Sequence, residues 1–119
     1  MLRLNSVMLG TKQLPAMTAF YEKVIGKSPD MSDTVSGYYG WQVGEVWLTV
    51  GDHSEMGGKT KDPGRVMFVL ETAQVKDEFE RLKALGAAVI KEPYELEGWW
   101  IATLADPDGN FFQLMPPMG

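Results

Sequence analysis

The side chains best suited to acid–base or metal chemistry gather in one polar segment near the middle of the chain. His53 is the only histidine, and Asp52 and Glu55 lie beside it. One imidazole between two carboxylates is a poor acid–base partner and an incomplete ligand set. The chain has no cysteine, which excludes thiolate ligands, disulfides and cysteine nucleophiles. We therefore interpret this cluster as a polar loop.

A second polar stretch, Gly57-Gly58-Lys59-Thr60, resembles the end of a phosphate-binding loop. It lacks the first glycine at the required spacing, and no strand-to-helix transition is predicted around it. We expect no nucleotide-binding function from it.

Aromatic residues give the clearest remaining signal. Trp41 and Trp47 lie on adjacent predicted strands, and Trp99-Trp100 opens a later strand. Side chains alternate across a strand, so one residue of the Trp99-Trp100 pair must face each side of its sheet. Aromatic side chains with few polar anchors are typical of small-molecule pockets. The alternative, that these tryptophans are core or dimer contacts, stays open.

Composition narrows the class of protein. The chain has 119 residues, 45% of them hydrophobic, and a formal charge of −5. Its lysines and arginines are scattered, so nucleic-acid binding is not expected. No apolar stretch approaches membrane-spanning length, and the N-terminus lacks the apolar core of a signal peptide. We expect a cytoplasmic protein without a membrane partner.

The pattern of elements predicts an α+β fold made of two similar halves. Helices are predicted from Pro15 to Ile25 and from Val75 to Leu85, and Gly26 and Gly86 follow them as C-caps. Strands are predicted at 4–9, 28–33, 38–43, 46–50, 65–70, 88–91, 99–105 and 110–115. The order strand, helix, three strands occurs twice, which indicates duplication. We expect a single domain with repeats at about 1–52 and 65–119, joined by a linker at 53–64.

Three segments resemble those of the vicinal-oxygen-chelate superfamily, the glyoxalase/bleomycin-resistance/dioxygenase group. They are the first helix from Leu14 to Gly26 with its Phe20-Tyr21 pair, the second helix from Phe79 to Gly86, and the ending Asp106-Pro107-Asp108-Gly109-Asn110. They span nearly the whole chain in the family's order. The resemblance implies paired βαβββ modules, a cup-shaped site and a homodimer.

The resemblance also implies four metal-ligand positions, which fall on Ser6, Leu48, Arg65 and Gln113. Leu48 has no donor atom, and Arg65 is permanently cationic. Divalent ions need imidazole, thiolate or anionic oxygen ligands. We therefore expect neither a metal nor another cofactor. Arg65 and Gln113 could instead orient a ligand carboxylate, or Arg65 could form an internal salt bridge to Glu71 or Glu97.

The sequence thus favours a metal-free protein of this superfamily that binds a small apolar or aromatic molecule and forms a homodimer. No catalytic residue is assigned. The alternative is a lyase, isomerase or dioxygenase of the same superfamily, using an unrecognised metal site or no metal. The candidate ligand-binding residues are Ser6, Trp41, Trp47, Leu48, Arg65, Trp99, Trp100, Phe111 and Gln113.

Overall fold

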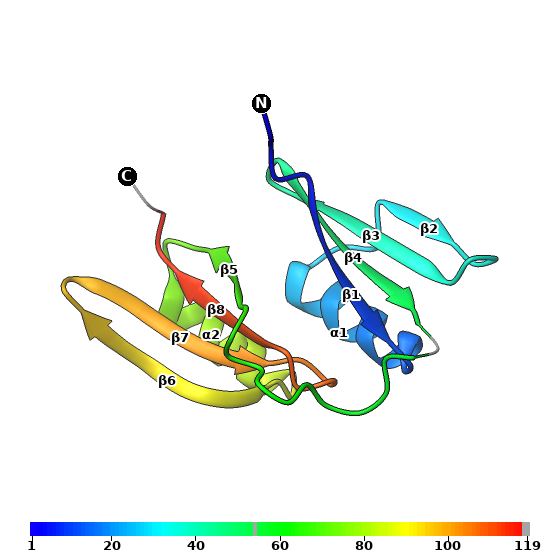
Figure 1. Cartoon of the computed structure of the whole chain (residues 1–119). Helices are drawn as coiled ribbons and strands as arrows, with labels where there is room; N and C mark the ends of the chain where they lie inside the picture. The colour runs from blue at the N-terminus through cyan, green and yellow to red at the C-terminus, as the bar shows by residue number, and fades with distance from the viewer. Residues whose placement is uncertain (54, 118–119) are drawn as a thin grey trace. The chain divides into compact units, whose positions relative to one another are not determined.

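Each half of the sequence folds into its own compact unit. The computed structural model describes residues 1–53 and 55–117, and the chain divides into unit 1, Met1–Gly58, and unit 2, Lys59–Gly119 (Figure 1). The boundary between the units falls inside the predicted linker at 53–64. Among the described residues, no helix is long and apolar enough to cross a membrane.

Unit 1 is a four-stranded mixed sheet with one helix. The sheet order is β1-β4-β3-β2, in which β1 pairs with β4 in parallel and the other neighbours are antiparallel. The elements in chain order are β1 (Ser6–Thr11), α1 (Leu14–Ile25), β2 (Met31–Asp33), β3 (Tyr38–Val43) and β4 (Val46–Asp52).

Unit 2 repeats this arrangement, with β6 and β7 longer than their counterparts β2 and β3. Its order is β5-β8-β7-β6, again with a parallel pair, β5 with β8, at one edge. The elements in chain order are β5 (Phe68–Glu71), α2 (Val75–Ala84), β6 (Ala88–Leu96), β7 (Trp99–Ala105) and β8 (Phe111–Met115). The predicted pair of βαβββ modules is therefore confirmed.

The two helices begin in the same way, which fixes the correspondence between the units. The hydroxyl of Thr11 accepts a hydrogen bond from the Gln13 amide at 3.0 Å. Thr72, 61 positions later, accepts one from the Gln74 amide at the same distance. Each of these two hydrogen bonds lies between the end of a strand and the first turn of a helix, and each gives a backbone amide a partner. After the helices, Gly26 and Gly86 adopt φ values of 89° and 95°, where a glycine is favoured.

Each unit buries one sheet face beneath its helix. In unit 1 the apolar side of α1 packs on β3 and β4, and in unit 2 the apolar side of α2 packs on β6, β7 and β8. Burying a large apolar side chain contributes roughly 1.5–3 kcal/mol, so these layers supply most of each unit's stability. The core includes Met17, Tyr21, Val24, Trp41, Leu48 and Val50 in unit 1, and Val75, Phe79, Leu82, Leu104, Phe112 and Leu114 in unit 2.

Six of the eight predicted strands differ from the observed ones in at least one bound, and only β3 and β7 match exactly. β1 begins at Ser6 rather than at residue 4, and β5 begins at Phe68 rather than at residue 65. β6 continues to Leu96, five residues beyond its predicted end. It contains Pro93, which would interrupt a central strand, but β6 lies at the sheet edge, where one side needs no hydrogen-bond partner.

Candidate ligand-binding surface

The register of each sheet decides which side chains face its helix. Residues paired across neighbouring strands share a face, and successive residues alternate. In unit 1 the pairs Val7–Leu48 and Leu48–Trp41 place these three residues on the face covered by α1. The row formed by Met8, Thr49, Gly40 and Met31 therefore lies on the opposite face, which we call the helix-free face of unit 1.

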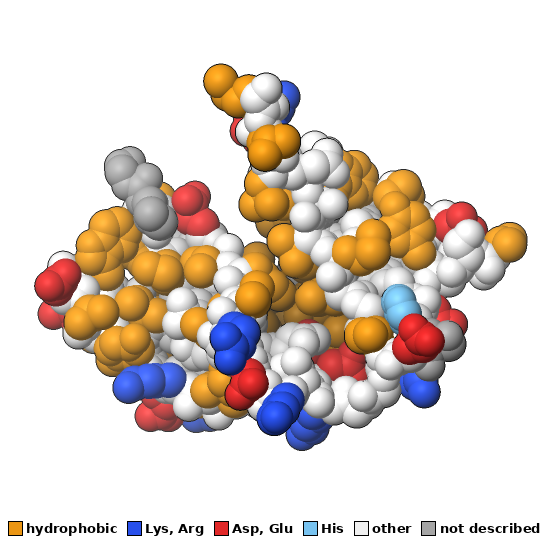
Figure 2. All heavy atoms as spheres, viewed as in Figure 1, with side chains coloured by type: hydrophobic (Ala, Val, Ile, Leu, Met, Phe, Trp, Pro, Cys, Tyr) orange, Lys and Arg blue, Asp and Glu red, His pale blue; other side chains and the backbone are white. Residues whose placement is uncertain are grey.

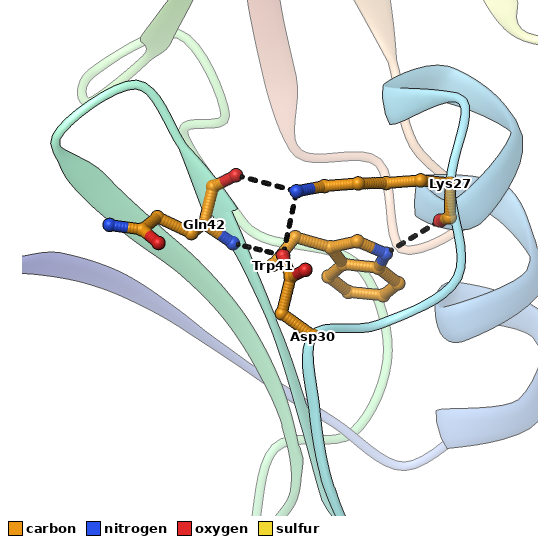
Figure 3. A network of polar contacts seen from close by, with 4 residues as sticks. All are labelled: Lys27, Asp30, Trp41 and Gln42. Atoms are coloured by element: carbon orange, nitrogen blue, oxygen red, sulfur yellow. Dashed lines mark hydrogen bonds and ion pairs between the residues drawn. The ribbon is translucent and has the colours of Figure 1, made fainter.

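Trp41 and Leu48 do not line a ligand surface, which corrects the prediction for both. Trp41 is completely buried, and its indole N–H donates a hydrogen bond to the Lys27 carbonyl oxygen at 3.0 Å (Figure 3). Leu48, its neighbour across the sheet, is also buried beneath α1. Both are core residues, because the strand register puts them on the covered face.

A polar network ties the same region together at the surface. The Lys27 ammonium donates to the Gln42 carbonyl oxygen at 3.1 Å and forms an ion pair with Asp30 at 2.8 Å (Figure 3). The Gln42 amide donates to the same Asp30 carboxylate. These contacts, led by that from Lys27, hold the pKa of Asp30 below its ordinary value. The network therefore joins the segment after α1 to β3.

The helix-free face of unit 1 carries Trp47 and Ser6, which are paired neighbours on β4 and β1. A Cβ atom added to Gly40 would lie 3.3 Å from the Trp47 ring and 3.4 Å from the Met31 methyl group. The indole of Trp47 and the thioether of Met31 thus flank the bare backbone of Gly40. This arrangement presents a flat aromatic and apolar surface.

The helix-free face of unit 2 combines a polar pair with aromatic side chains. The Gln113 amide donates a hydrogen bond to the Thr103 hydroxyl at 3.2 Å, and the two residues are paired across β8 and β7. Trp99 lies on the same side of β7, and Phe111 on the same side of β8. In Figure 1, α2 lies behind the sheet of unit 2. Figure 2, in the same view, shows hydrophobic side chains gathered over the front face of that sheet.

The two neighbouring tryptophans of β7 point to opposite sides. The Lys76 ammonium of α2 lies 3.7 Å from the Trp100 ring centroid, a cation–π contact that places Trp100 on the helix side. Trp99 therefore belongs to the helix-free face, and it is 36% exposed. The structure separates two residues that the sequence could not tell apart, and it removes Trp100 from the candidate surface.

Arg65 is not on a sheet face, which corrects its predicted inward position. It precedes β5 in a turn closed by a hydrogen bond from its own amide to the Asp62 carbonyl oxygen. Its side chain is 78% exposed and lies 3.9 Å from the Asp62 carboxylate. An exposed pair at that distance contributes little stability. The salt bridges to Glu71 or Glu97 that the sequence left open are not present among the contacts of Arg65.

The repeat also corrects the register of the metal-ligand positions. Thr11 corresponds to Thr72, so Ser6 corresponds to Met67 rather than to Arg65. The parallel pairs Val7–Leu48 and Phe68–Phe112 make Thr49, not Leu48, the counterpart of Gln113.

The four corrected metal-ligand positions carry uncharged side chains. They offer two hydroxyls, one thioether and one amide, from Ser6, Thr49, Met67 and Gln113. Divalent ions in this class of site require imidazole or carboxylate ligands, which these side chains do not supply. Within residues 1–53 and 55–117, no group of three or more histidine, cysteine or acidic side chains could hold a metal ion. The donor set does not fit the family's divalent metal.

Sequence reasoning missed several residues of the helix-free face of unit 2. Tyr94 and Leu96 pair with Ile101 and Trp99, and so share their face. The alternation Tyr94-Glu95-Leu96 is the signal that could have extended the strand to them. Val69 on β5, 46% exposed, joins them through its pairing with Gln113.

The comparisons with known proteins agree with this architecture. Residues 6–115 match the model of the glyoxalase-like domain family, so the chain belongs to that family, within the glyoxalase/bleomycin-resistance/dioxygenase superfamily. No curated protein matches the chain significantly.

Several solved structures share the fold. A glyoxalase-related enzyme from Fulvimarina pelagi is 20% identical, with a TM-score of 0.81 over all of this chain and 94% of that one. A glyoxalase/bleomycin resistance protein/dioxygenase family enzyme from Burkholderia phytofirmans PsJN is 25% identical, with a TM-score of 0.73 over 98% and 100% of the two chains. A glyoxalase/bleomycin resistance protein from Albidiferax ferrireducens T118 is 18% identical, with a TM-score of 0.75 over 96% and 98%.

Proposed function

We propose that this protein binds a small apolar or aromatic molecule on the helix-free faces of its sheets, without a divalent metal. The observation that carries the proposal is the Gln113–Thr103 pair on the face that also presents Trp99 and Leu96. A few oriented polar groups within an apolar surface are the usual composition of a ligand site. Some relatives bear names that refer to bleomycin resistance, and capture of a drug-like ligand would suit this arrangement.

The hydrogen-bonded pair Gln113–Thr103 indicates the kind of ligand that the surface would bind. Gln113 uses one amide N–H on Thr103, which leaves a second N–H and the carbonyl oxygen for a ligand. A neutral hydroxyl or amide on an aromatic ring matches these groups. The carboxylate preference inferred from the sequence depended on Arg65, which lies outside the sheet. We therefore propose a neutral hydrogen-bonding aromatic ligand in its place.

Stacking on aromatic side chains supplies the remaining affinity. The exposed part of Trp99 offers a flat surface, and an aromatic pair contributes roughly 0.5–1.5 kcal/mol beyond the apolar area that it buries. Phenols and aromatic amides should therefore bind more tightly than aliphatic molecules of equal size.

Calorimetric titration with phenols, aromatic amides, aromatic carboxylates and aromatic amines tests the proposal. Trp99→Leu should weaken binding of the best ligand at least tenfold, because its ring lies on the proposed surface. The matched control is Trp100→Leu, which changes the neighbouring residue on the helix side and should change affinity less than twofold. Equal losses of affinity in both variants, or no binding by any aromatic class, would overturn the proposal.

Catalysis is the alternative, and two similar structures are described as enzymes. Mass spectrometry of the ligand after prolonged incubation, with and without added Mn²⁺, Fe²⁺, Ni²⁺ or Zn²⁺, separates the two functions. A binding protein returns the ligand unchanged in every sample. Conversion that appears only with a metal would favour the enzyme and contradict the metal-free proposal.

A further inference from the structure

Two side chains that carry metal-donor atoms, those of His53 and Met56, lie over Gly10 of β1 on the helix-free face of unit 1. A Cβ atom added to Gly10 would lie 3.1 Å from Cγ of Met56 and 3.3 Å from Cβ of His53. Both side chains therefore lie directly on the backbone of Gly10. Figure 2 shows the histidine side chain at the surface, with hydrophobic and acidic side chains next to it.

Met8 provides a second thioether, on the same strand and the same face as Gly10. Met8 and Gly10 are two residues apart, so they share a face and their Cα atoms lie about 6.6 Å apart. A methionine side chain is long and flexible enough to span much of this distance. The thioether of Met8 can therefore meet that of Met56 above the strand. Met8 is 68% exposed and Met56 is 50% exposed, so both side chains are open to solvent.

The backbone holds His53 and Met56 in place. The His53 amide donates to the Thr11 carbonyl oxygen at 2.9 Å, and the Met56 amide donates to the His53 carbonyl oxygen at 3.0 Å. These bonds attach the segment after β4 to the end of β1. Any side chain at position 10 would crowd Met56 and His53, so the glycine permits their close approach.

We propose that His53, Met56 and Met8 bind a soft monovalent metal ion, Cu(I) or Ag(I). Thioethers and imidazole form a ligand set that suits Cu(I), whereas Mg²⁺, Ca²⁺ and Mn²⁺ require oxygen ligands. Nearby, the Lys12 ammonium lies 3.4 Å from the position that a Cβ atom added to Gly57 would occupy. Its charge repels a divalent ion twice as strongly as a monovalent ion. The site is separate from the corrected positions Ser6, Thr49, Met67 and Gln113.

Coordination has a specific consequence at His53. The Glu55 amide donates a hydrogen bond of 3.3 Å to Nδ1 of the ring. An ion bound at Nδ1 takes the place of this hydrogen bond. An ion bound at Nε2 moves the ring proton to Nδ1, which can then no longer accept one. Either mode breaks the contact, so the Glu55 amide reports on the ion.

The test is titration of the whole chain with Ag⁺, and with Cu(I) under anaerobic conditions against a chromogenic Cu(I) chelator. We expect one ion per chain and at least a tenfold loss of affinity in Met8→Leu, Met56→Leu and His53→Gln. Leucine conserves the volume of methionine, so these variants should remain folded. The matched control is Met31→Leu, on the same sheet face but three strands from Met8, and its affinity should stay within twofold of wild type.

Nuclear magnetic resonance provides the second readout. Saturating Ag⁺ should shift the methyl signals of Met8 and Met56 and the amide signal of Glu55, and leave the Met31 methyl signal in place. Unchanged affinity in Met8→Leu and Met56→Leu would overturn the proposal. An equal loss in Met31→Leu, or Zn²⁺ binding as tightly as Ag⁺ at His53, would also overturn it.

Discussion

At the scale of single residues, position relative to the strand register decides which polar side chains can serve a ligand. Gln113 lies within β8 and directs its amide to Thr103 across the sheet. Arg65 precedes β5 and extends from a turn beside Asp62. Both residues occupy motif positions in the sequence, but only Gln113 is fixed by strand pairing. A side chain that orients a ligand needs a position fixed by strand pairing. The charge of an exposed arginine is largely screened by solvent.

This difference gives a paired prediction. Arg65→Ala should change the affinity for aromatic carboxylates and for phenols less than twofold, whereas Gln113→Leu should weaken phenol binding about tenfold, the equivalent of one hydrogen bond of about 1.4 kcal/mol. Calorimetric titration of both variants measures these effects. A large loss of carboxylate affinity in Arg65→Ala would restore the anion anchor inferred from the sequence.

Trp41 provides a prediction about stability. Trp41→Phe removes the hydrogen bond to the Lys27 carbonyl oxygen and leaves a small cavity beneath α1, so we expect a loss of about 2 kcal/mol in the free energy of unfolding. Trp99→Leu, on the partly exposed helix-free face, should cost less than about 1 kcal/mol. Urea denaturation compares the two variants. A larger loss in Trp99→Leu would contradict the assignment of the faces.

At the scale of elements, the connections after each helix and strand show how local contacts hold the modules together. The Thr11 and Thr72 hydroxyls start the two helices in the same way. Beyond α1, the Lys27–Asp30–Gln42 network attaches the segment before β2 to β3. In the next turn, the amides of Ser36 and Val35 donate to the Asp33 carboxylate and lower its pKa. Carboxylates therefore hold both ends of β2.

Asp30 gives the pH prediction at this scale. Its pKa is lower in the folded protein than in the unfolded chain, so its contribution to stability is present above pH 4 and is lost as the pH falls through the folded value. Asp30→Asn should lower the melting temperature at pH 7. This difference from wild type should shrink between about pH 4 and pH 2. A difference that stayed constant over the whole range would show that the charge of Asp30 does not contribute.

At the scale of the whole molecule, the neutral donor set predicts insensitivity to chelators. Ser6, Thr49, Met67 and Gln113 supply no anionic or imidazole ligand, so we expect the melting temperature to change by less than about 1 °C when EDTA is added. Elemental analysis of protein purified without chelator should find no stoichiometric Zn, Ni, Mn or Fe. A fall in melting temperature with EDTA, restored by one of these ions, would contradict the prediction.

The exposed apolar residues lead to a prediction about assembly. Val69 and Leu96 lie on the helix-free face of unit 2, and Leu2 and Leu4 precede β1, all with large exposed fractions. Apolar surface of this kind commonly marks an interface. We expect a two-fold symmetric homodimer, with twice the 13.2 kDa mass of the chain in light scattering at micromolar concentration. A monomeric mass would contradict this expectation, and Leu96→Glu should weaken the dimer if this face forms the interface.

The sequence by itself determined the duplicated architecture. Apolar spacing identified both helices, and Gly26, Gly86 and the Asp106–Gly109 turn marked where elements end. β3 and β7 have the predicted bounds. These features are local, because helix and turn formation depend on contacts within a few residues. The three family motifs are also short, continuous segments of the chain, so they can be identified from the sequence. The family model that matches residues 6–115 agrees with this resemblance.

Tertiary structure decided which side of each sheet a residue occupies. A shift of one residue in strand pairing moves every side chain to the other face. The nearly continuous apolar strands at 46–50 and 99–105 lack the polar–apolar alternation that would reveal the buried face. For this reason Trp41, Leu48 and Trp100 could not be separated in advance from Trp47 and Trp99. The same uncertainty affected Arg65, whose position depends on where β5 begins. The approach of His53 and Met56 to Gly10 likewise joins two segments of the chain that only tertiary packing brings together.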